Sequence, residues 1–395
     1  MAGHDGVRPS ATTNTAPSGV SSGRRQPAGD DVLSARALNR ALLERQLLLG
    51  RVRRSALETV EHLVGMQAQI PGAPYYSLWA RLDGFRPDDL SDLIAGRRAV
   101  RTSLMRSTIH LVTADDCLAL YPVIRPVLSR TLHSGSPFGR RTAGVDSNTL
   151  VAAARALLDE RSRTKAELGR LLHESWPDHD AEALAYAVQL QTPLVQVPPR
   201  GLWGQSGQPT HATAERWLGR PLASETAPDR LVLRYLAAFG PATVGDVQAW
   251  SGLAGLRDVV ERLRPALRTL RDERGRELFD LPDAPLPDPE TPAAVRLLGD
   301  YDNVLLAHAD RSRIIPERHR AEVVPNIGRP PVLVDGFVRG WWKLTRERDV
   351  ATLRVELFEP VPEPDHTALI EESRRLLAFA APDAARTDVR ITCLA

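Results

Sequence analysis

The spacing of apolar and polar residues predicts the same order of elements three times along the chain. In each repeat an amphipathic helix is followed by a second helix that begins with Ser or Thr and carries an acid three residues later, the pattern of a capping box. The capping boxes are Ser55-Ala-Leu-Glu58, Thr164-Lys-Ala-Glu167 and Thr243-Val-Gly-Asp246. The first helices are expected at about 35–49, 148–160 and 229–239, and the third helices at about 75–81, 181–191 and 256–263. One capping box is common, but three in the same position predict a repeated unit.

Two short strands are expected after each helical triplet. They lie at 100–105 and 107–112, at 194–197 and about 205–211, and at 266–270 and 277–281. Asp272-Glu-Arg-Gly275 is a strong turn signal within the last pair. Three helices and a hairpin form a winged helix-turn-helix, a motif that usually binds DNA. We therefore expect three tandem winged-helix units, at 35–135, 136–225 and 226–285.

The remainder of the chain has a different pattern. The Pro- and Asp-rich stretch 282–292 is typical of a linker. Beyond it, strands are expected at 332–334, 337–344, 352–358 and 389–393, and one helix at about 365–380. Asp335-Gly336 between apolar runs predicts a hairpin. The expected fold class is therefore α+β, with a β-rich C-terminal domain at 286–395.

The N-terminal residues 1–34 are expected to form a disordered tail. They are rich in Ser, Gly, Thr, Ala and Pro and lack the apolar core of a signal peptide. No run of the sequence approaches the roughly 18 apolar residues that a membrane span requires. A cytoplasmic protein is expected.

The composition excludes several kinds of chemistry. Two cysteines, Cys117 and Cys393, cannot form a disulfide framework or a structural zinc site. The sequence has no GxxxxGK[ST], HExxH, CxxC or GxSxG motif, which argues against nucleotide hydrolysis, zinc proteolysis and serine-hydrolase chemistry. The lysines are Lys165 and Lys343 alone, so a Schiff-base lyase step is not expected.

The net charge is only +2, but the positive charge is unevenly distributed. Four arginines fall within the acid-free stretch 97–106, and four more within 311–320: Arg97, Arg98, Arg101 and Arg106, then Arg311, Arg313, Arg318 and Arg320. Local clusters of this kind can bind phosphates even when the whole chain is nearly neutral. An ordinary solvated face is the alternative for each cluster.

The segment 63–74 carries the most unusual pattern. The helix that begins at Ser55 is expected to stop at Gly65, and Pro71 and Pro74 prevent an immediate restart. Gln67 and Gln69 should therefore lie on a short extended piece, where side chains two residues apart point to the same side. The sequence thus places two carboxamides next to each other.

Paired amides can hold a water molecule, because each amide both accepts and donates hydrogen bonds. They are not strong bases, so they suit a reaction whose leaving group departs almost unaided. Hydrolysis of a cationic, alkylated purine from deoxyribose is such a reaction. The alternative is structural: the two glutamines cap the preceding helix or satisfy buried backbone.

Other ionisable residues give weaker signals. His110 alternates with Thr108 and Val112 on the first expected hairpin, where it could contact phosphate or pack in the core. The segment 300–313 begins with turn formers, continues apolar and ends basic, which would place His308, Asp310, Arg311 and Arg313 near a groove. A surface loop with an internal Asp310–Arg pair is the alternative.

Four blocks of the chain resemble the signature blocks of a known family. They are Gly65-Met-Gln-Ala-Gln-Ile-Pro71, Leu104-Met-Arg-Ser-Thr-Ile-His-Leu-Val112, Leu305-Leu-Ala-His-Ala-Asp-Arg-Ser-Arg313 and Val334-Asp-Gly-Phe-Val-Arg-Gly340. They resemble the AlkZ-type winged-helix bacterial DNA glycosylases, which are associated with resistance to azinomycin and similar DNA-alkylating antibiotics. The resemblance runs from about Leu38 to the C-terminus, and the Gln-x-Gln and His-x-Asp-Arg blocks together are fairly specific.

The resemblance implies three tandem winged-helix units and a C-terminal β-domain, C-shaped around a basic channel for duplex DNA. It also implies base excision without metal or cofactor, with Gln67 and Gln69 as the pair that positions water. A related branch has aspartate at the second position, so Gln69 makes this chain similar to the antibiotic-resistance branch. Weakly activated water fits cationic lesions better than neutral ones.

We therefore expect a monomeric, monofunctional DNA glycosylase that acts on double-stranded DNA carrying N7-alkylguanine or N3-alkyladenine. Expected DNA contacts are Arg97, Arg98, Arg101, Arg106, His110, His308, Asp310, Arg311 and Arg313. Two other hypotheses stay open. A winged-helix transcriptional regulator would prefer one DNA sequence, and a drug-sequestering protein would bind the free toxin.

Overall fold

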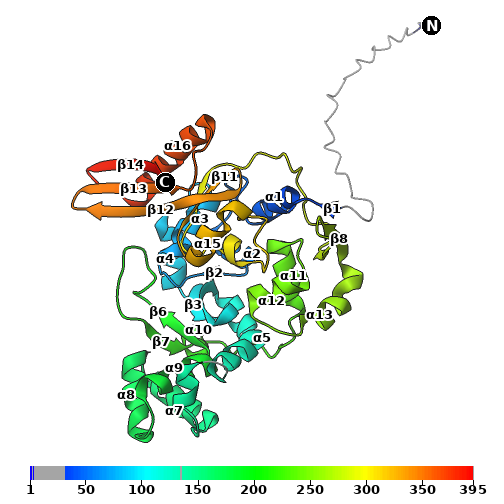
Figure 1. Cartoon of the computed structure of the whole chain (residues 1–395). Coiled ribbons are helices and arrows are strands. Elements are labelled where there is room, and N and C mark those ends of the chain that lie inside the picture. The colour runs from blue at the N-terminus through cyan, green and yellow to red at the C-terminus, as the bar shows by residue number, and fades with distance from the viewer. Residues whose placement is uncertain (2, 4–31, 134–135, 395) are drawn as a thin grey trace.

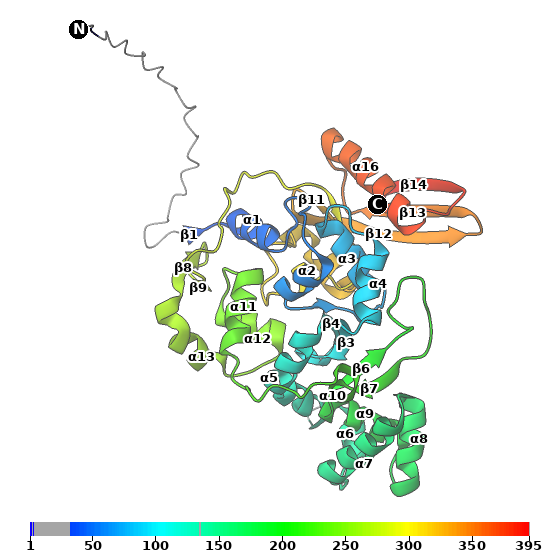
Figure 2. The same ribbon diagram turned by 180° about the vertical axis from the view of Figure 1, so that it is seen from behind.

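The computed structural model describes residues 1, 3, 32–133 and 136–394. The predicted tail lies almost entirely outside these residues. The C-terminal sheet with its long helix and the second repeat lie at opposite ends of the molecule, and the third repeat lies to one side (Figures 1 and 2). Among the described residues, no helix is both long and apolar enough to cross a membrane.

The threefold order of elements is confirmed, except that unit 1 has a fourth helix, α4, between its third helix and its hairpin, which was not predicted. Unit 1 contains α1 (Ala35–Arg45), α2 (Ala56–His62), α3 (Ala73–Arg81), α4 (Pro87–Ala95), β3 (Ala99–Ser103) and β4 (Ile109–Thr113). Unit 2 contains α7 (Ser147–Glu160), β5 (Arg163–Thr164), α8 (Lys165–Ser175), α9 (Ala181–Gln191), β6 (Leu194–Val197) and β7 (Thr210–Thr213). Unit 3 contains α11 (Asp229–Phe239), α12 (Val244–Ser251), α13 (Leu256–Leu263), β8 (Arg268–Asp272) and β9 (Glu277–Asp280).

All three predicted capping boxes are present. In α2, α8 and α12 the hydroxyl of the first residue accepts from the backbone N–H three residues on, and the acid there accepts from the cap backbone. Each box satisfies two N–H groups that a helix start otherwise leaves without a partner. The second helix of every unit therefore begins where the sequence predicts.

The main departure from the prediction is α5 (Ala114–His133), a helix that joins units 1 and 2. It contains Pro122 and Pro126, which normally interrupt a helix because proline has no N–H to donate. Ten of its residues are buried, among them Ile124 and Leu128, which belong to the main core. Tertiary packing thus overrides the local sequence signal. Two short helices, α6 (Pro137–Arg141) and α10 (Ala214–Leu218), were not predicted either.

The hairpins of units 1 and 2 join in one six-stranded sheet, in the order β2-β4-β3-β6-β7-β5. Strand β2 (Met66–Gln67) occupies one edge, and Figure 1 places it near the middle of the molecule. The two hairpins meet where β3 pairs with β6, at Arg101 opposite Gln196. In unit 3, β8 instead pairs with β1 (Val32–Leu33).

Unit 1 differs from the other two units at the edge of its hairpin. In unit 2 the second hairpin strand pairs with β5, directly before the second helix, and in unit 3 Ala242 bridges to Phe279 in the same way. In unit 1 the partner of β4 is β2, which follows the second helix. The extended piece that carries Gln67 therefore takes an edge that the other units fill with a different segment.

The C-terminal domain is a five-stranded sheet in the order β10-β11-β12-β13-β14. The strands are β10 (Arg296–Leu297), β11 (Pro331–Val334), β12 (Phe337–Glu347), β13 (Val350–Leu357) and β14 (Arg386–Cys393). Helix α16 (Glu363–Ala380) crosses between the parallel strands β13 and β14, and α14 (Asn303–Leu306) and α15 (Arg320–Val323) lie between β10 and β11. The predicted C-terminal strands and helix are confirmed, and the fold is a mixed α+β fold.

Buried ion pairs connect unit 1 to the rest of the chain. Arg81 donates through both terminal nitrogens to Asp302, at 2.8 Å each, and both side chains are fully buried. The Arg81 guanidinium holds the pKa of Asp302 below its usual range, against the effect of burial. A similar two-point pair links Arg45 to Asp280 in unit 3. Since an uncompensated buried charge is very costly, these pairs fix how unit 1 sits on its neighbours.

Replacing Asp302 should destabilise the protein strongly. Asp302→Ala leaves the Arg81 guanidinium buried without a counter-charge, so we expect the free energy of unfolding to fall by about 3–5 kcal/mol. Urea denaturation followed by circular dichroism measures the loss. The control Glu174→Ala breaks the exposed pair with Arg170 and should cost at most about 0.5 kcal/mol. Equal effects of the two variants would contradict the role of the buried pair.

Candidate functional site

The segment 63–69 leaves α2 through a tight turn. Val64 and Gly65 both have positive φ, 55° and 86°. A Cβ at Gly65 would lie 2.5 Å from Cγ1 of Val112, so only glycine allows the chain to approach β4 this closely. The predicted end of the helix near Gly65 is confirmed, and the chain continues as the extended strand β2.

Strand β2 is short but well held along β4. Gln67 lies opposite His110 in the antiparallel register, and the Ala68 N–H donates to the Ile109 carbonyl at 2.8 Å. The extended geometry predicted for the Gln-x-Gln segment is therefore confirmed at Gln67, whereas Gln69 lies in a bend just beyond the strand. Gln67 is only 7% exposed, whereas Gln69 is open to solvent.

Two buried side chains from distant parts of the sequence hold the backbone of the same segment. Asn303, at the start of α14, donates from Nδ2 to the Gly65 carbonyl at 2.7 Å and accepts from the Gln67 N–H at 3.4 Å. Arg101 of β3 donates from Nη2 to the Ala68 carbonyl at 2.7 Å. With both sides occupied, the backbone that carries the glutamines has little freedom to move.

The two amide groups have defined orientations. The Gln67 Oε1 accepts from the Arg106 Nη2 at 2.9 Å, and the Gln69 Oε1 accepts from the Ile109 N–H at 3.3 Å. A guanidinium and a backbone N–H can only donate, so these contacts identify the oxygen end of each amide. Each oxygen keeps a second lone pair, and each NH₂ group keeps its two donors. Among the described residues, no carboxylate contacts either amide.

Arginine side chains without counter-charges lie beside this pair. Arg106, in the turn between β3 and β4, also donates to the Trp250 carbonyl. Burial, with a smaller contribution from the nearby Arg311, lowers its pKa to about 10. The Arg311 pKa is lowered by burial and by Arg320.

We call Arg106, Arg311 and Arg320 the arginine cluster. Within the part of the chain that the structure describes, none of the three pairs with an acid, and the buried Arg311 Nε has no hydrogen-bond partner. Arg106 and Arg311 are partly buried, and Arg320 is exposed beside them. Partly buried positive charges that repel one another are costly unless an anion compensates them. The cluster therefore has the chemistry of a phosphate site adjacent to Gln67.

His110 is a neutral, fully buried residue beside this site. Burial, together with the charge of Arg106, lowers its pKa to about 3. Its Nδ1 lies 3.0 Å from the Thr108 carbonyl, and its buried Nε2 has no partner among the described residues. The contact with the carbonyl makes Nδ1 the protonated nitrogen. His110 therefore lies opposite Gln67 on the neighbouring strand and does not offer a charge to DNA.

Four of the expected DNA contacts lie in the interior. Arg101, His110, His308 and Arg313 are at most 4% exposed. Their polar groups are engaged inside the protein: Arg101 with Ala68 and Gln196, His308 with the Phe239 carbonyl, and Arg313 with the Pro241 carbonyl. A direct phosphate contact is therefore not supported for these four residues. Position in a basic stretch does not show which side chains face outward.

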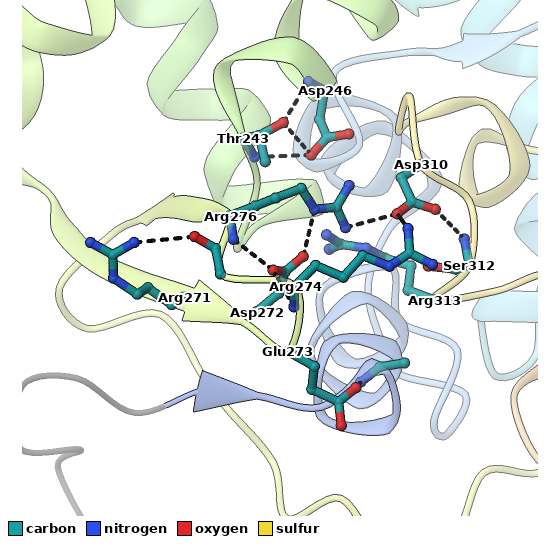
Figure 3. Close-up of polar contacts among 12 residues, drawn as sticks. Thr243, Asp246, Arg271, Asp272, Glu273, Arg274, Arg276, Asp310, Ser312 and Arg313 are labelled. Carbon is teal, nitrogen blue, oxygen red and sulfur yellow. Dashed lines mark hydrogen bonds and ion pairs between the residues drawn. The ribbon is translucent and has the colours of Figure 1, made fainter.

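Asp310 is also engaged within the protein. It accepts from Arg274 at 2.9 Å and forms an ion pair with Arg276 at 2.7 Å, and both arginines belong to the β8–β9 turn (Figure 3). Asp310 was expected near a DNA groove, with a pair to an arginine of its own segment as the alternative, but its arginine partners come from unit 3. The contact ties unit 3 to the segment that carries Arg311. Asp310 thus positions the arginines of the β8–β9 turn. It is an anion and is not itself a suitable ligand for phosphate.

Arg97 and Arg98 are exposed but distant from Gln67 along the hairpin. They line a surface cavity of about 540 Å³ at the end where Ala99 pairs with Thr113, and the Arg97 guanidinium stacks 4.1 Å from the Trp217 ring. The turn that holds Arg106 is at the opposite end of the hairpin. The first arginine stretch is therefore divided between two surfaces and the interior.

The predicted site omitted Asn303 and Arg320. Asn303 follows the turn formers Asp300 and Asp302, but its contact with Gly65 spans 238 positions and has no local signature. Arg320 was noted as a member of the second basic stretch but was not included among the expected DNA contacts. Long-range contacts of this kind become visible only in the fold.

Comparisons with known proteins agree with one another. The model of the DNA glycosylase AlkZ-like family matches residues 60–379. A curated relative, an interstrand DNA cross-link repair glycosylase from Streptomyces sahachiroi, is 26% identical over 336 residues, which cover 78% of this chain and 88% of the relative. The solved structure of Streptomyces sahachiroi DNA glycosylase AlkZ matches with a TM-score of 0.72 at 23% identity, covering 92% of this chain and 100% of that chain.

The buried histidines predict how stability depends on pH. Burial lowers the pKa of His110 to about 3, of His211 to about 4 and of His308 to about 3, from 6.5. Below pH 6.5 the unfolded chain binds protons that the folded chain does not, so stability falls as the pH falls. Each histidine should cost about 2 kcal/mol between pH 6.5 and pH 5.

Urea denaturation at pH 7 and pH 5 measures this effect. His110→Gln should reduce the difference in the free energy of unfolding between pH 7 and pH 5 by the contribution of one histidine. The control His133→Gln changes an exposed residue at the end of α5 and should leave the difference unchanged. Identical stability of the wild-type protein at both pH values would show that these histidines are not buried in neutral form.

Proposed function

Since this chain belongs to the DNA glycosylase AlkZ-like family, we propose that it hydrolyses the N-glycosidic bond of cationic alkylpurines in duplex DNA, namely N7-alkylguanine and N3-alkyladenine. Family membership makes the chain a DNA glycosylase and not a transcriptional regulator or a drug-sequestering protein. One observation supports this substrate class most directly. The candidate site carries one amide on strand β2 and a second in the bend just after it, and no described carboxylate contacts them.

In the proposed reaction water replaces the base at the anomeric carbon. The C1′–N9 bond breaks, and the purine leaves with the bonding electron pair, which neutralises its positive charge. The water oxygen bonds to C1′, one proton passes to solvent, and an abasic site remains. The lesion provides the leaving-group activation, so the protein needs to orient water more than to deprotonate it.

Gln67 and Gln69 would orient this water. The free lone pair of each Oε1 can accept a water hydrogen, which directs the oxygen of that water away from the strand. Arg106 holds the oxygen end of Gln67 in place and, being a cation, keeps its amide a weak acceptor. A weak acceptor suits cationic lesions, and it fits neutral bases poorly because they require stronger activation.

The proposed DNA path passes the arginine cluster. We assign units 1 to 3 as winged-helix units and propose that, with the C-terminal domain, they form a C-shaped basic channel around the duplex. Arg106, Arg311 and Arg320 would bind the backbone next to the lesion, with Arg97 and Arg98 as more distant phosphate contacts. Contacts of this kind position the duplex and carry no sequence information.

The relative from Streptomyces sahachiroi is described as an interstrand cross-link repair glycosylase. We propose the same class of lesion for this chain: bulky adducts and crosslinks formed by alkylating antibiotics, removed for self-resistance or repair. A monomer would suffice, because the proposed site is built from one chain.

Removing either amide should abolish base excision. Gln67→Ala and Gln69→Ala are expected to stop the formation of abasic sites at a defined N7-alkylguanine while DNA affinity stays nearly unchanged. Strand cleavage after heating in mild alkali measures excision. Gln208→Ala, an exposed glutamine on the β6–β7 loop, is the matched control and should remain active. Unchanged excision by both variants would remove the proposed mechanism.

Removing a member of the arginine cluster should weaken DNA binding generally. Arg311→Ala is expected to lower affinity several-fold for lesion-bearing and intact duplexes alike, and to make the slope of log K against log salt shallower by about 1, because one phosphate contact is lost. Fluorescence anisotropy over a range of salt concentrations measures both. The control Arg390→Ala removes an arginine of β14 that pairs with Asp388. An Arg311→Ala slope equal to that of the control would contradict the assignment.

A further inference from the structure

An aromatic cluster lies directly beyond the two glutamines. Its members come from α3, the α3–α4 connection, the β6–β7 loop, β12 and α16 and pack ring against ring: Tyr75, Tyr76, Trp79, Phe85, Trp203, Trp342 and Phe379. The half-buried Trp203 lies at its edge, with ring centroids 5.0 Å from Tyr75, 5.7 Å from Tyr76 and 5.3 Å from Phe379. The cluster contains many ring contacts, and part of it is exposed to solvent.

A cavity of about 420 Å³ opens on this cluster. Its wall includes Pro71 and Gly72, the second and third residues after Gln69, together with Tyr76 and Trp203. The volume is within the usual range of small-molecule sites, about 300–1,000 Å³. The cavity wall therefore begins two residues after Gln69.

One buried side chain connects the cavity wall to the glutamine strand. Arg101 binds the Ala68 carbonyl, and its Cδ would lie 3.0 Å from a Cβ at Gly201, so the β6–β7 loop passes directly over it. The same loop is anchored where the Tyr75 hydroxyl donates to the Gly201 carbonyl at 2.8 Å and the Trp203 N–H donates to Ser91 Oγ at 3.2 Å. Trp203 is thus held at a fixed place relative to Gln67 and Gln69.

We propose that this cavity receives the planar aromatic part of a bulky adduct on the base that the two glutamines attack, and that Trp203 is the residue that selects for it. The inference rests on the proposed function. Aromatic rings gain free energy from stacking on other rings. Partly exposed rings that are already fixed in a concave wall offer that contact at little cost in conformational entropy. Arg346 and Asp383 form an ion pair at 2.9 Å at the border of the cavity and give it a polar rim.

The proposal separates two substrates that carry the same reacting bond. An N7-methylguanine has no group that could reach the cavity, so its excision needs the amides and the DNA contacts alone. An N7-adduct with a fused two-ring aryl group would gain binding energy from Trp203. If that contact improves as the bond breaks, it also raises the rate of excision.

The test compares two duplexes of one sequence, carrying a single N7-methylguanine or a single N7-(naphthylmethyl)guanine, with rates corrected for spontaneous depurination. The enzymes are the wild type, Trp203→Ala, Trp203→Phe and the control Trp176→Ala, which removes a half-buried tryptophan at the end of α8 in unit 2. Single-turnover excision rates at subsaturating enzyme are measured for each pair. Excision of the methyl lesion also reports whether each variant is folded and active.

We expect Trp203→Ala to lower the rate on the naphthylmethyl lesion about tenfold, the effect of losing one or two ring contacts, and to leave the methyl lesion unchanged. Trp203→Phe should recover most of the loss, and Trp176→Ala should affect neither lesion. If Trp203→Ala lowered the excision rate equally on both lesions, or on neither, the inference would be overturned, although the wild type would still show excision. Absence of excision by the wild type on both lesions would instead overturn the proposed function.

Discussion

The candidate site depends on one constraint: an extended strand must run between two helices without leaving its backbone polar groups unpaired. Buried N–H and C=O groups require partners, because losing their water is otherwise costly. Strand β4 provides partners on one side of the strand, and the side chains of Asn303 and Arg101 provide them elsewhere. The side chains of Gln67 and Gln69 project from a backbone that is already fixed.

This constraint explains why charged and polar residues are buried around the site. Arg101 is costly to bury, and burial lowers its pKa to about 10, but its guanidinium reaches both Ala68 and the β6 side chain Gln196. Asn303 is held in place by its neighbour Asp302, which pairs with Arg81 in the core of unit 1. The same buried groups therefore stabilise the fold and fix the position of the neighbouring side chains that would contact substrate.

The sequence predicted the local features of the fold well and the long-range ones poorly. The three capping boxes and the extended piece at Gln67 follow from short-range rules, and the structure confirms them. The bend that turns the chain at Gln69 was not predicted. Helix α5 was missed because Pro122 and Pro126 argue against it locally, whereas packing between two units stabilises it. The basic stretches predicted a positively charged surface, but Arg101 and Arg313 are buried, since clustering along the chain does not determine which face a side chain takes.

The claim that Gln67 and Gln69 hold the attacking water is tested most directly by a crystal structure with a duplex that contains a cationic azaribose in place of the lesion nucleotide. Such a sugar imitates the positive charge that develops at the anomeric centre. The account predicts an ordered water hydrogen-bonded to both amide groups, facing the ring nitrogen from the side opposite the departed base, with the adjacent phosphate on the arginine cluster. A sugar bound away from strand β2, with both amides still turned toward β4 and no shared water, would contradict it.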